Sequence, residues 1–507
     1  MTTQSKRIVV MSGALTEVPH DRPRRTQERN RDGLTNTVND PDERYPIRID
    51  TSYFAPRHRV LDRLAGSVGR QEPARLAKRS IELILGTDIE IGGATSPERR
   101  VGITPDNVAQ LIEFFAELEI QLSVQVLENA GALAGWSDSD YIRAGARIIR
   151  QQEIADHGAP DVVHALKEPS RYEACFRGPF LRIGALHVGD FSPASGLAQL
   201  LIRRDVALFD GSATGAPEEF RIPIRGRMSL FAGEIAAEWV IEHMTGQNLR
   251  GRVVVVGGGN VGAACVRKLS AVHAVEAITI CEAASDPQRV SRVAAALADV
   301  STVHVVGIEG LDDPRLLAAL DGAVAVVFAV FARGQRAPRV VSVQALRDRL
   351  SDQAMVIDVS IDERGAIQDD SAGTEWNSEK LIPWFEERLQ PLRYRAVPNM
   401  PRAYPHEASA AHGDVIAPYL ATLLYLTARY GGPLGALRRL REIPINLRGS
   451  DPLVADETEV FSALLQDLRN GLAICPTAHG LEIAKTMPAP DRAAIQIILE
   501  KTPMPGK

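Results

Sequence analysis

Apolar runs and amphipathic stretches alternate along the chain from Ile81 onward. The segments read IELILGTDIEI, VAQLIEFFAELEI, LSVQVLE, DYIRAGARII and APDVVHAL, in that order. Short β-branched runs are typical of strands, whereas apolar residues three or four positions apart are typical of one face of a helix. This alternation of strands and helices predicts a mainly parallel sheet that is covered by helices.

A second alternation begins near Arg252 with RVVVVGGGNVG and continues through AITICE, TVHVVGI, AVAVVFAVF and MVIDVSI. Its apolar runs are unbroken, as expected when a parallel sheet is buried on both faces. The segment FAGEIAAEWVIEHMTG, between the two alternations, predicts a bridging helix. The helical pattern of IAPYLATLLYLTARY, after Pro405, indicates that the C-terminal part packs back on the first domain.

Residues 1–80 differ in character from the rest of the chain. They are polar and arginine-rich, as in DRPRRTQERNRDG, and show no sustained period of a helix or a strand. We therefore expect most of them to form an irregular, solvated N-terminal extension. Phosphate binding by its basic residues is the alternative.

Composition narrows the class of protein. A chain of 507 residues exceeds what one hydrophobic core usually supports, so two or more domains are expected. A hydrophobic fraction of 45% and a charged fraction of 24% are ordinary for a folded, water-soluble protein. The formal net charge of -6 offers no general attraction to a phosphate backbone, so no nucleic acid partner is expected. No run approaches the roughly 20 apolar residues of a membrane-spanning helix, so no membrane association is expected.

The cysteines and the start of the chain bear on compartment and metal content. The 4 cysteines form no CxxC pair, which favours neither a disulfide framework nor a thiolate metal site. No set of His, Asp and Glu shows ligand spacing such as HExxH, so no metal is expected. The apolar stretch at residues 8–11 is too short for the core of a signal peptide, and a reducing cytoplasm is the expected location.

A glycine-rich turn comes directly after the predicted strand RVVVV. Gly257, Gly259 and Gly262 have the GxGxxG spacing and directly precede the helical stretch AACVRKLSAV. The first glycine permits a tight turn, the second lets the backbone approach a pyrophosphate, and the third allows the helix to pack closely on the strand. We therefore expect these glycines, with Asn260 and Val261 between them, to bind a dinucleotide at the helix N-terminus.

Glu282 ends the next predicted strand, about 20 residues beyond the glycines, where an acid accepts hydrogen bonds from the adenosine ribose. A carboxylate there repels a 2′-phosphate, and no arginine comes immediately after it, since the next residues are AAS. The pattern therefore predicts NAD rather than NADP. The alternative is a structural turn with a surface glutamate.

Four segments upstream of this unit occur in a recognisable order: SPERRVGITPDNVAQL, AGALAGWSDSDYIRAGARI, LKEP and ALHVGD. Together they resemble the family that holds alanine dehydrogenase, the N-terminal part of nicotinamide nucleotide transhydrogenase and lysine-forming saccharopine dehydrogenase. The resemblance runs from about Ile91 to about Tyr419. It implies an α/β fold with two Rossmann-like parallel-sheet domains that flank a cleft, the first domain being discontinuous in sequence.

Domain boundaries are predicted from the pattern and the resemblance together. Residues 1–80 form the extension, and residues 81–227 the first part of a substrate domain. Residues 228–399 form the NAD-binding Rossmann domain. Residues 400–507 return to the substrate domain and end in a tail, of which the part after Gly431 matches nothing in the family.

The resemblance also implies site residues. The arginine of the family's ERRV-like segment binds the substrate carboxylate, and Arg100 is the matching position, with Arg99 beside it. A guanidinium can hold a carboxylate through two parallel hydrogen bonds. Lys167 of the KEP segment and His187 match a pair that polarises the carbonyl or imine and relays protons, as groups that titrate near neutrality can. The alternatives are a solvated surface lysine and a structural histidine.

Downstream segments supply further candidates by the same resemblance. AVFARGQRAP, with Ala329 and Val330, resembles the loop over the nicotinamide ribose. In VIDVSID, Asp362 matches an aspartate that faces the reacting centre in alanine dehydrogenase, and Asp358 is the weaker candidate.

The segment VPNMPRAYPHEAS carries the last group of candidates. Asn399 and Met400 match a segment at the edge of the cofactor, and His406 is assigned to substrate binding. The stretch NMP resembles alanine dehydrogenase. The saccharopine dehydrogenase branch is resembled by PHEAS with the GD and P that follow it, and by the segments DVSID and ERR. We favour the second branch.

These features predict an NAD-dependent dehydrogenase that acts on the C–N bond of an amino acid or of a secondary amine made from an amino acid and a 2-oxo acid. One alternative is an alanine dehydrogenase-like enzyme that uses free ammonia. Another is a non-catalytic NAD-binding regulatory protein, which the joint presence of Arg100, Lys167, His187 and Asp362 disfavours. Amino acids and 2-oxo acids are the expected partners. A homo-oligomer is compatible with the sequence, which determines neither the oligomeric state nor the substrate side chain.

Overall fold

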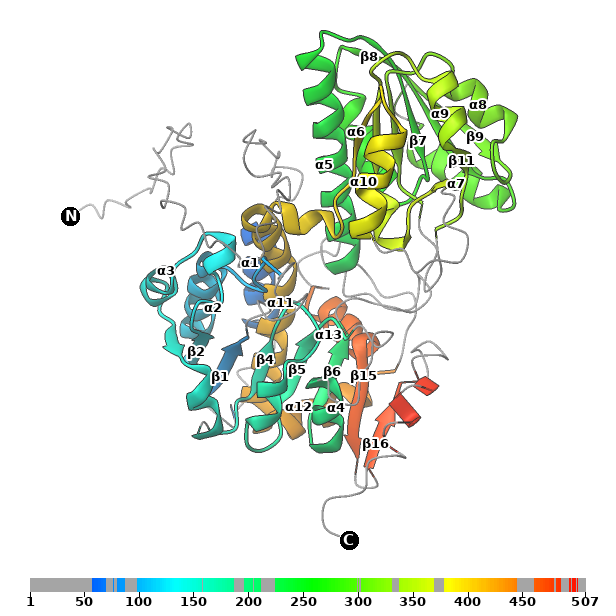
Figure 1. Cartoon of the computed structure of the whole chain (residues 1–507). Coiled ribbons are helices and arrows are strands. Elements are labelled where there is room, and N and C mark those ends of the chain that lie inside the picture. Colours follow the sequence, from blue (N-terminus) through cyan, green and yellow to red (C-terminus); the bar gives the residue numbers. More distant parts are fainter. Residues whose placement is uncertain are drawn as a thin grey trace, which may run out of the picture. The chain divides into compact units, whose positions relative to one another are not determined.

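The computed structural model describes residues 57–69, 76, 80–86, 98–156, 158–186, 196–203, 205–210, 224–298, 300, 302–330, 337–368, 378–444, 460–477, 480–484 and parts of 492–499. Two large sheets organise these residues (Figure 1). Each sheet has its own hydrophobic cores. No helix in the described residues is long and apolar enough to cross a membrane.

The first sheet has 8 strands in the described residues, in the order β16-β15-β6-β5-β4-β1-β2-β3. The strands are β1 (Ser80–Leu85), β2 (Gln121–Leu127), β3 (Arg147–Ile149), β4 (Val162–His164), β5 (Leu181–Gly184), β6 (Ala207–Asp210), β15 (Leu472–Thr477) and β16 (Gly480–Ile483). The pairs from β3 to β6 are parallel, which confirms the mainly parallel sheet expected from the sequence. β15 joins β6 in the antiparallel direction, as does β16 with β15, so part of the unmatched tail completes this sheet.

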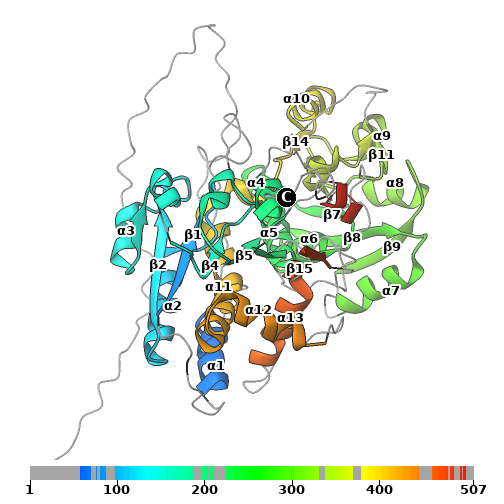
Figure 2. The same cartoon turned by 90° about the horizontal axis from the view of Figure 1, so that it is seen from below.

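Helices from both ends of the chain cover the first sheet. They are α1 (Arg57–Gly69), α2 (Pro105–Glu117), α3 (Asp138–Arg143), α4 (Gly196–Arg203), α11 (Pro405–Tyr430), α12 (Pro433–Glu442) and α13 (Val460–Gly471), with short 3-10 helices η3 (Ala132–Ala134), η4 (Gln151–Asp156) and η5 (Arg171–Cys175). The helices α1, α11, α12 and α13 lie side by side (Figure 2). Ile416, Leu420 and Leu423 of α11 share a core with Leu83 of β1, so α11 packs on the first sheet.

The helix α1 departs from the irregular extension expected up to residue 80. Leu61, Leu64 and Val68 are buried in the same core as α11, at a spacing that places them on one face of a helix. That short apolar stripe is embedded in an arginine-rich sequence, which masks its helical period. Residues 1–56 lie outside the described residues.

The second sheet has the order β14-β12-β10-β7-β8-β9, and its pairs are parallel. Its strands are β7 (Gly251–Val256), β8 (Val275–Ala283), β9 (Val303–Ile308), β10 (Ala325–Phe328), β12 (Met355–Asp358) and β14 (Arg393–Arg395). Read from β9, this is the 3-2-1-4-5-6 order of a Rossmann sheet. The predicted Rossmann domain is therefore confirmed, with β7 as its first strand.

Helices flank this sheet too, and a small sheet of β11 (Val341–Ser342) and β13 (Ile367–Gln368) accompanies it. The elements are α5 (Ile224–Gly246), α6 (Asn260–Leu269), α7 (Pro287–Ala296), α8 (Pro314–Leu320), α9 (Val343–Arg349), α10 (Ser378–Arg388), η7 (Val359–Glu363) and η8 (Met400–Ala403). The predicted bridging helix is α5, whose Ile235 and Trp239 lie in the core of this domain. The expected boundary at residue 227 therefore falls inside a helix.

The close approach of α5 to α6 requires Gly233, where an added Cβ would lie 2.1 Å from the backbone oxygen of Val261.

Two buried histidines connect the first sheet to α11. The rings of His164, on β4, and His412, on α11, stack with their centroids 5.7 Å apart. His164 Nδ1 lies 2.9 Å from the oxygen of Ile183. Within the described residues, His164 Nε2 and both ring nitrogens of His412 have no hydrogen-bond partner. A Cβ at position 102 would lie 2.4 Å from His164 Nε2, so the chain passes this ring as Gly102.

Burial keeps both rings neutral. It lowers the pKa of His164 from 6.5 to about 4, and the charge of Arg182 acts in the same direction. Burial also lowers the pKa of His412 well below 6.5, and the charge of Arg100 adds to the effect, whereas the charge of Glu98 opposes it. Below pH 6.5 the unfolded chain therefore binds protons that the native chain excludes, and the free energy of unfolding falls. For His164 the loss accumulates down to its native pKa of about 4 and amounts to about 3 kcal/mol.

We expect His412→Leu to reduce the acid-induced loss of stability, because it removes one of the groups that only the unfolded chain protonates. The same change should raise the free energy of unfolding at neutral pH, since it removes a buried ring whose nitrogens lack partners. Urea titrations at about pH 7.5 and about pH 5 measure both effects. His304→Leu, at an exposed position on β9, is the control. If the free energy of unfolding falls by the same amount between the two pH values in the wild type and in His412→Leu, then His412 is not a group that only the unfolded chain protonates.

Candidate active site

The turn between β7 and α6 contains the three glycines of the GxGxxG pattern. Gly257 has a φ of 100°, in the left-handed region that favours glycine. A Cβ at Gly262 would lie 1.9 Å from the oxygen of Gly257, so the third glycine is what lets α6 pack on the strand. Among the described residues, a Cβ at Gly259, the N-cap of α6, would meet one atom within 4 Å, at 3.7 Å, so those residues leave the space over the turn open. This open turn, with Asn260 and Val261 as the first residues of α6, fits a dinucleotide pyrophosphate at the helix N-terminus.

Glu282, on β8, points back to the glycine turn. Its Oε2 accepts a hydrogen bond from the backbone nitrogen of Gly258 at 2.8 Å, and its Oε1 lies 3.1 Å from Arg289 Nε. No arginine comes directly after Glu282 in the sequence, and the expectation of NAD relied partly on that absence. The fold nevertheless brings Arg289, on α7, to this carboxylate. Arg289 is 47% exposed, so a cation is available beside the position at which an acid binds the adenosine ribose.

Ala329 and Val330 come after β10, at the same edge of the sheet. β10 pairs in parallel with β7, so the carboxyl ends of the two strands lie together. A Cβ at Gly257 would lie 2.6 Å from the oxygen of Ala329, and the nitrogen of Val330 donates to Ser360 Oγ at 3.1 Å. These contacts place both residues next to the glycine turn. Their contact with a cofactor stays a prediction.

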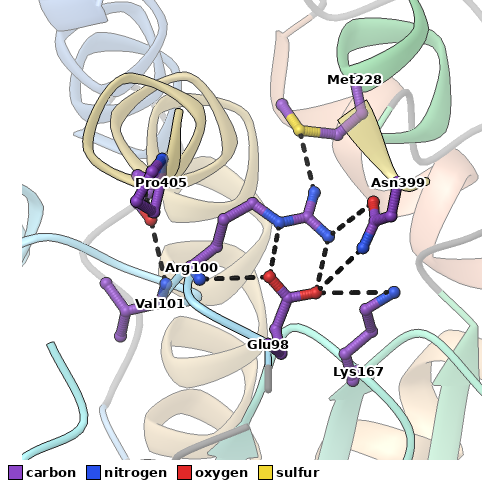
Figure 3. Close-up of polar contacts among 8 residues, drawn as sticks. Glu98, Arg100, Val101, Lys167, Met228, Asn399 and Pro405 are labelled. Atoms are coloured by element: carbon purple, nitrogen blue, oxygen red, sulfur yellow. Dashed lines mark hydrogen bonds and ion pairs between the residues drawn. The ribbon is translucent and has the colours of Figure 1, made fainter. Parts of the chain in front are cut away.

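A buried ion pair forms the centre of the second group of candidates (Figure 3). Arg100 donates from Nε to Glu98 Oε1 and from Nη2 to Glu98 Oε2, both at 2.8 Å. The two side chains are only 5% and 2% exposed, respectively. The segment is anchored at the start of α11, because the nitrogen of Val101 donates to Ser409 Oγ at 2.9 Å. The bidentate pair therefore holds the guanidinium of Arg100 in one orientation.

Lys167 approaches the same carboxylate, since its Nζ lies 3.7 Å from Glu98 Oε2. Burial raises the pKa of Glu98, but the hydrogen bonds and charge of Arg100, together with the charge of Lys167, outweigh burial and hold this pKa at about 2. Glu98 is therefore ionised at any physiological pH. The side chain of Lys167 is 19% exposed, so it lies at the edge of the buried cluster.

Asn399 and Met228 complete the surroundings of Arg100 (Figure 3). Arg100 Nη2 donates to Asn399 Oδ1 at 3.2 Å, and Asn399 Nδ2 donates to Glu98 Oε2 at 3.3 Å. Asn399 has a φ of 49°, a left-handed conformation that asparagine tolerates better than most residues. Arg100 Nη1 faces the thioether sulfur of Met228, on α5, at 3.7 Å. Asn399, expected at the cofactor edge, thus contacts the arginine and the glutamate.

The structure brings Arg100, Lys167 and Asn399 together, and it adds Glu98 and Met228, which the sequence patterns did not single out. Glu98 stands in the ERRV segment itself, and a buried arginine needs a carboxylate nearby, so this residue could have been found from the sequence. Nothing in the local sequence points to Met228, because its position depends on how α5 packs.

The other candidates lie elsewhere or are not described. Arg99 is half-buried. His406 is exposed, and its ring stacks on Trp136 with the centroids 4.1 Å apart. The side chain of Met400 is buried in a core of the Rossmann domain. Asp358 is buried as the N-cap of η7, where Oδ1 accepts from the nitrogen of Ser360, so it has a structural role there. His187 and the side chain of Asp362 lie outside the described residues. In the described part of the chain, no group of 3 or more His, Cys, Asp or Glu residues could hold a metal ion.

A Rossmann domain with an open glycine turn, together with a second parallel-sheet domain that presents a buried arginine and a lysine, defines a two-domain dinucleotide-dependent oxidoreductase. Family models agree with this class. The model "Alanine dehydrogenase/PNT, N-terminal domain" matches residues 94–231, and "Alanine dehydrogenase/PNT, C-terminal domain" matches residues 242–431. The chain belongs to the alanine dehydrogenase/PNT family, and its cofactor is NAD(H).

Individual relatives are distant. "Alanine dehydrogenase 2" of Staphylococcus aureus (strain USA300) is 26% identical over 342 residues, which are 64% of this chain and 84% of that protein. "Alanine dehydrogenase" of Staphylococcus saprophyticus is 26% identical over 366 residues, 68% of this chain and 90% of that protein. A solved "L-alanine dehydrogenase" has a TM-score of 0.54 at 20% identity, covering 82% of this chain and 100% of its own. A solved transhydrogenase from Sinorhizobium meliloti has a TM-score of 0.50 at 15% identity, and the match covers 68% of this chain and 96% of that protein. The predicted family and fold are confirmed, whereas the leaning toward saccharopine dehydrogenase finds no support among these relatives.

We expect NAD(H) to bind much more tightly than NADP(H), because Glu282 would face a 2′-phosphate. Glu282→Gln should narrow the difference in affinity between NAD(H) and NADP(H), since it removes the repelling charge and releases Arg289 to bind the 2′-phosphate. The double variant Glu282→Gln/Arg289→Ala should widen this difference in affinity again, because it also removes the cation of Arg289. Calorimetric titration of each variant with both dinucleotides measures the effect. Equal affinities of the wild type for the two would show that Glu282 does not select the cofactor.

Proposed function

We propose that this chain is an NAD(H)-dependent amino acid dehydrogenase that interconverts an amino acid with its 2-oxo acid and free ammonia. The observation that carries the proposal is the buried guanidinium of Arg100, with the ammonium of Lys167 close to the same glutamate. The named relatives that are alanine dehydrogenases support the reaction class.

The surroundings of Arg100 favour a carboxylate ligand. Its Nε and Nη2 atoms already donate to Glu98 and Asn399. Its Nη1 atom faces the sulfur of Met228, which is a weak acceptor. A carboxylate would form a charge-assisted hydrogen bond at Nη1, roughly twice as strong as one between neutral groups. These contacts support Nη1 as the donor that binds an anionic substrate group.

The charge of the cluster is suited to one carboxylate. Arg100 and Lys167 are cations and Glu98 is an anion with a pKa of about 2, which leaves one positive charge. A monocarboxylate such as a simple 2-oxo acid neutralises that charge. A second substrate carboxylate would need a further cation. The cluster therefore favours a small 2-oxo acid over a long, doubly acidic secondary amine.

Each side chain then has a chemical role. When bound, NAD(H) supplies the hydride acceptor for the substrate Cα–H bond, or the donor in the reverse direction. Arg100 holds the substrate carboxylate, and Glu98 and Asn399 hold Arg100. The ammonium of Lys167 polarises the C=O or C=N bond. To His187 we assign the acceptance of the proton that the amine releases, and to Asp362 a role at the reacting centre, both by the family resemblance. In the oxidative direction the amino acid loses a hydride and a proton to form an imine, which water hydrolyses to the 2-oxo acid and ammonium.

Kinetics of substituted enzymes separate binding from chemistry. Lys167→Met should lower kcat by on the order of a hundredfold or more with little change in KM, because polarisation strengthens in the transition state. Arg100→Lys keeps a cation beside Glu98 but loses the Nη1 donor, so it should mainly raise KM, by about tenfold to a hundredfold. Steady-state rates of both variants, with circular dichroism to verify folding, measure these effects. Normal turnover of folded Lys167→Met would refute its assigned role.

The substrate is testable by NADH oxidation, followed by absorbance, with a panel of 2-oxo acids, each combined with ammonia, lysine, ornithine or glutamate. We expect turnover with a monocarboxylic 2-oxo acid and ammonia. Turnover only with lysine or another amino acid as the amine would support the saccharopine dehydrogenase-like alternative instead. NADH binding without turnover on any pair would support the non-catalytic alternative and overturn the proposal.

A further inference from the structure

A second buried ion pair lies next to the segment that carries Lys167. Arg182, on β5, donates from Nε to Glu173 Oε2, in η5, at 3.2 Å. Both side chains are 0% exposed. Glu173 Oε1 accepts a hydrogen bond from the nitrogen of Ser170 at 3.0 Å, so the carboxylate also holds the start of η5. None of these contacts belongs to the cluster around Arg100.

The remaining donors of Arg182 connect two strand ends. Nη1 donates to the oxygen of Ala185 at 3.3 Å, and Nη2 donates to the oxygen of Lys167. The two carbonyls come after β4 and β5, which are parallel neighbours (Figure 1). Lys167 carries the proposed polarising ammonium, and Ala185 precedes His187 by two positions in the sequence. One guanidinium therefore cross-links the backbone of Lys167, which carries the proposed polarising ammonium, to the end of β5.

Gly184 makes room for this arrangement. A Cβ at that position would lie 2.5 Å from Arg182 Nη1 and 2.1 Å from the oxygen of Ala165. Only a glycine allows the guanidinium to fold back over its own strand toward the strand ends. The planar fork of arginine directs three donors at three acceptors in fixed directions, which the ammonium of a lysine cannot reproduce.

Stability alone does not account for the pair. Removing two charges from water costs free energy that their attraction often fails to recover, and apolar replacement of a buried pair is frequently neutral or stabilising. Two apolar side chains would fill the same space between β5 and η5. They would not hold the carbonyls of Lys167 and Ala185.

We infer that Arg182, held by Glu173, is a positioning residue that fixes the backbone of Lys167 against the end of β5 for the proposed reaction. The inference rests on the proposed function. A displacement of about 1 Å at a reacting group can cost about a hundredfold in rate. The effect of losing Arg182 should therefore appear in kcat.

The test uses the full-length enzyme and the double variant Arg182→Met/Glu173→Met, which removes both charges and leaves no unpaired one. We expect it to fold, with an NADH dissociation constant close to that of the wild type, because the glycine turn belongs to another sheet. Its kcat should fall by on the order of a hundredfold, with a smaller change in KM. Arg182→Lys keeps a cation beside Glu173 but loses the planar guanidinium that also donates to the carbonyls of Lys167 and Ala185. The kcat of this variant should fall by about tenfold or more.

Arg203→Met is the matched control. Arg203, on α4, also donates to backbone carbonyls, those of Ala174 and Gly178, but to neither Lys167 nor Ala185. It should lower the free energy of unfolding and leave kcat unchanged. If the pair serves only folding, then Arg182→Met/Glu173→Met and Arg182→Lys will turn over normally once folded, and the inference is overturned.

A second comparison separates this inference from the proposed function. If Arg182 acts through Lys167, the kcat loss of the double variant should largely disappear in a Lys167→Met background, because groups that work as a unit are not additive. Additive losses would contradict the inference while leaving the role of Lys167 intact. Normal turnover of Lys167→Met itself would instead refute the proposed function.

Discussion

A buried charge must be paired, and this constraint organises the candidate active site. Arg100 is almost completely removed from solvent, so its guanidinium requires acceptors that are fixed in place. Glu98 supplies two of them, and Asn399, from a distant part of the chain, supplies a third. The orientation of the arginine is thus set before any substrate arrives, which is the preorganisation that substrate binding and catalysis require.

Two buried arginines in the described part of the chain, Arg100 before α2 and Arg182 on β5, are held by a glutamate in this way. Around Arg100 the printed contacts leave Nη1 facing the thioether of Met228, and we propose that this donor binds substrate. Around Arg182 the donors go to Glu173 and to the backbone of Lys167 and Ala185, so that pair holds protein atoms only. The ends of parallel strands gather loops at one edge of a sheet, and a buried guanidinium between them can hold those loops in a fixed relation.

The Rossmann domain depends on a different constraint, the lack of side chains at its glycine turn. Gly262 allows α6 to approach the strand, and Gly259 keeps the helix N-terminus open. Glu282 bonds to the backbone of this turn and also pairs with Arg289. We therefore expect cofactor choice to depend on this pair of opposite charges and not on Glu282 alone.

The sequence by itself determined both parallel sheets and the glycine turn and indicated that α11 packs on the first core, whereas Arg100 and Lys167 were singled out by the resemblance to a family. The sheets, the turn and α11 depend on local periodicity or on short motifs whose chemistry is contained in adjacent residues. The sequence did not reveal α1, the completion of the first sheet by β15 and β16, or the contacts of Met228, Arg289 and Arg182. Each of these depends on the packing of elements that are far apart in the chain. Tertiary structure alone decided which acceptors a buried guanidinium reaches, because a hydrogen bond depends on distances of a few ångströms that sequence separation does not specify.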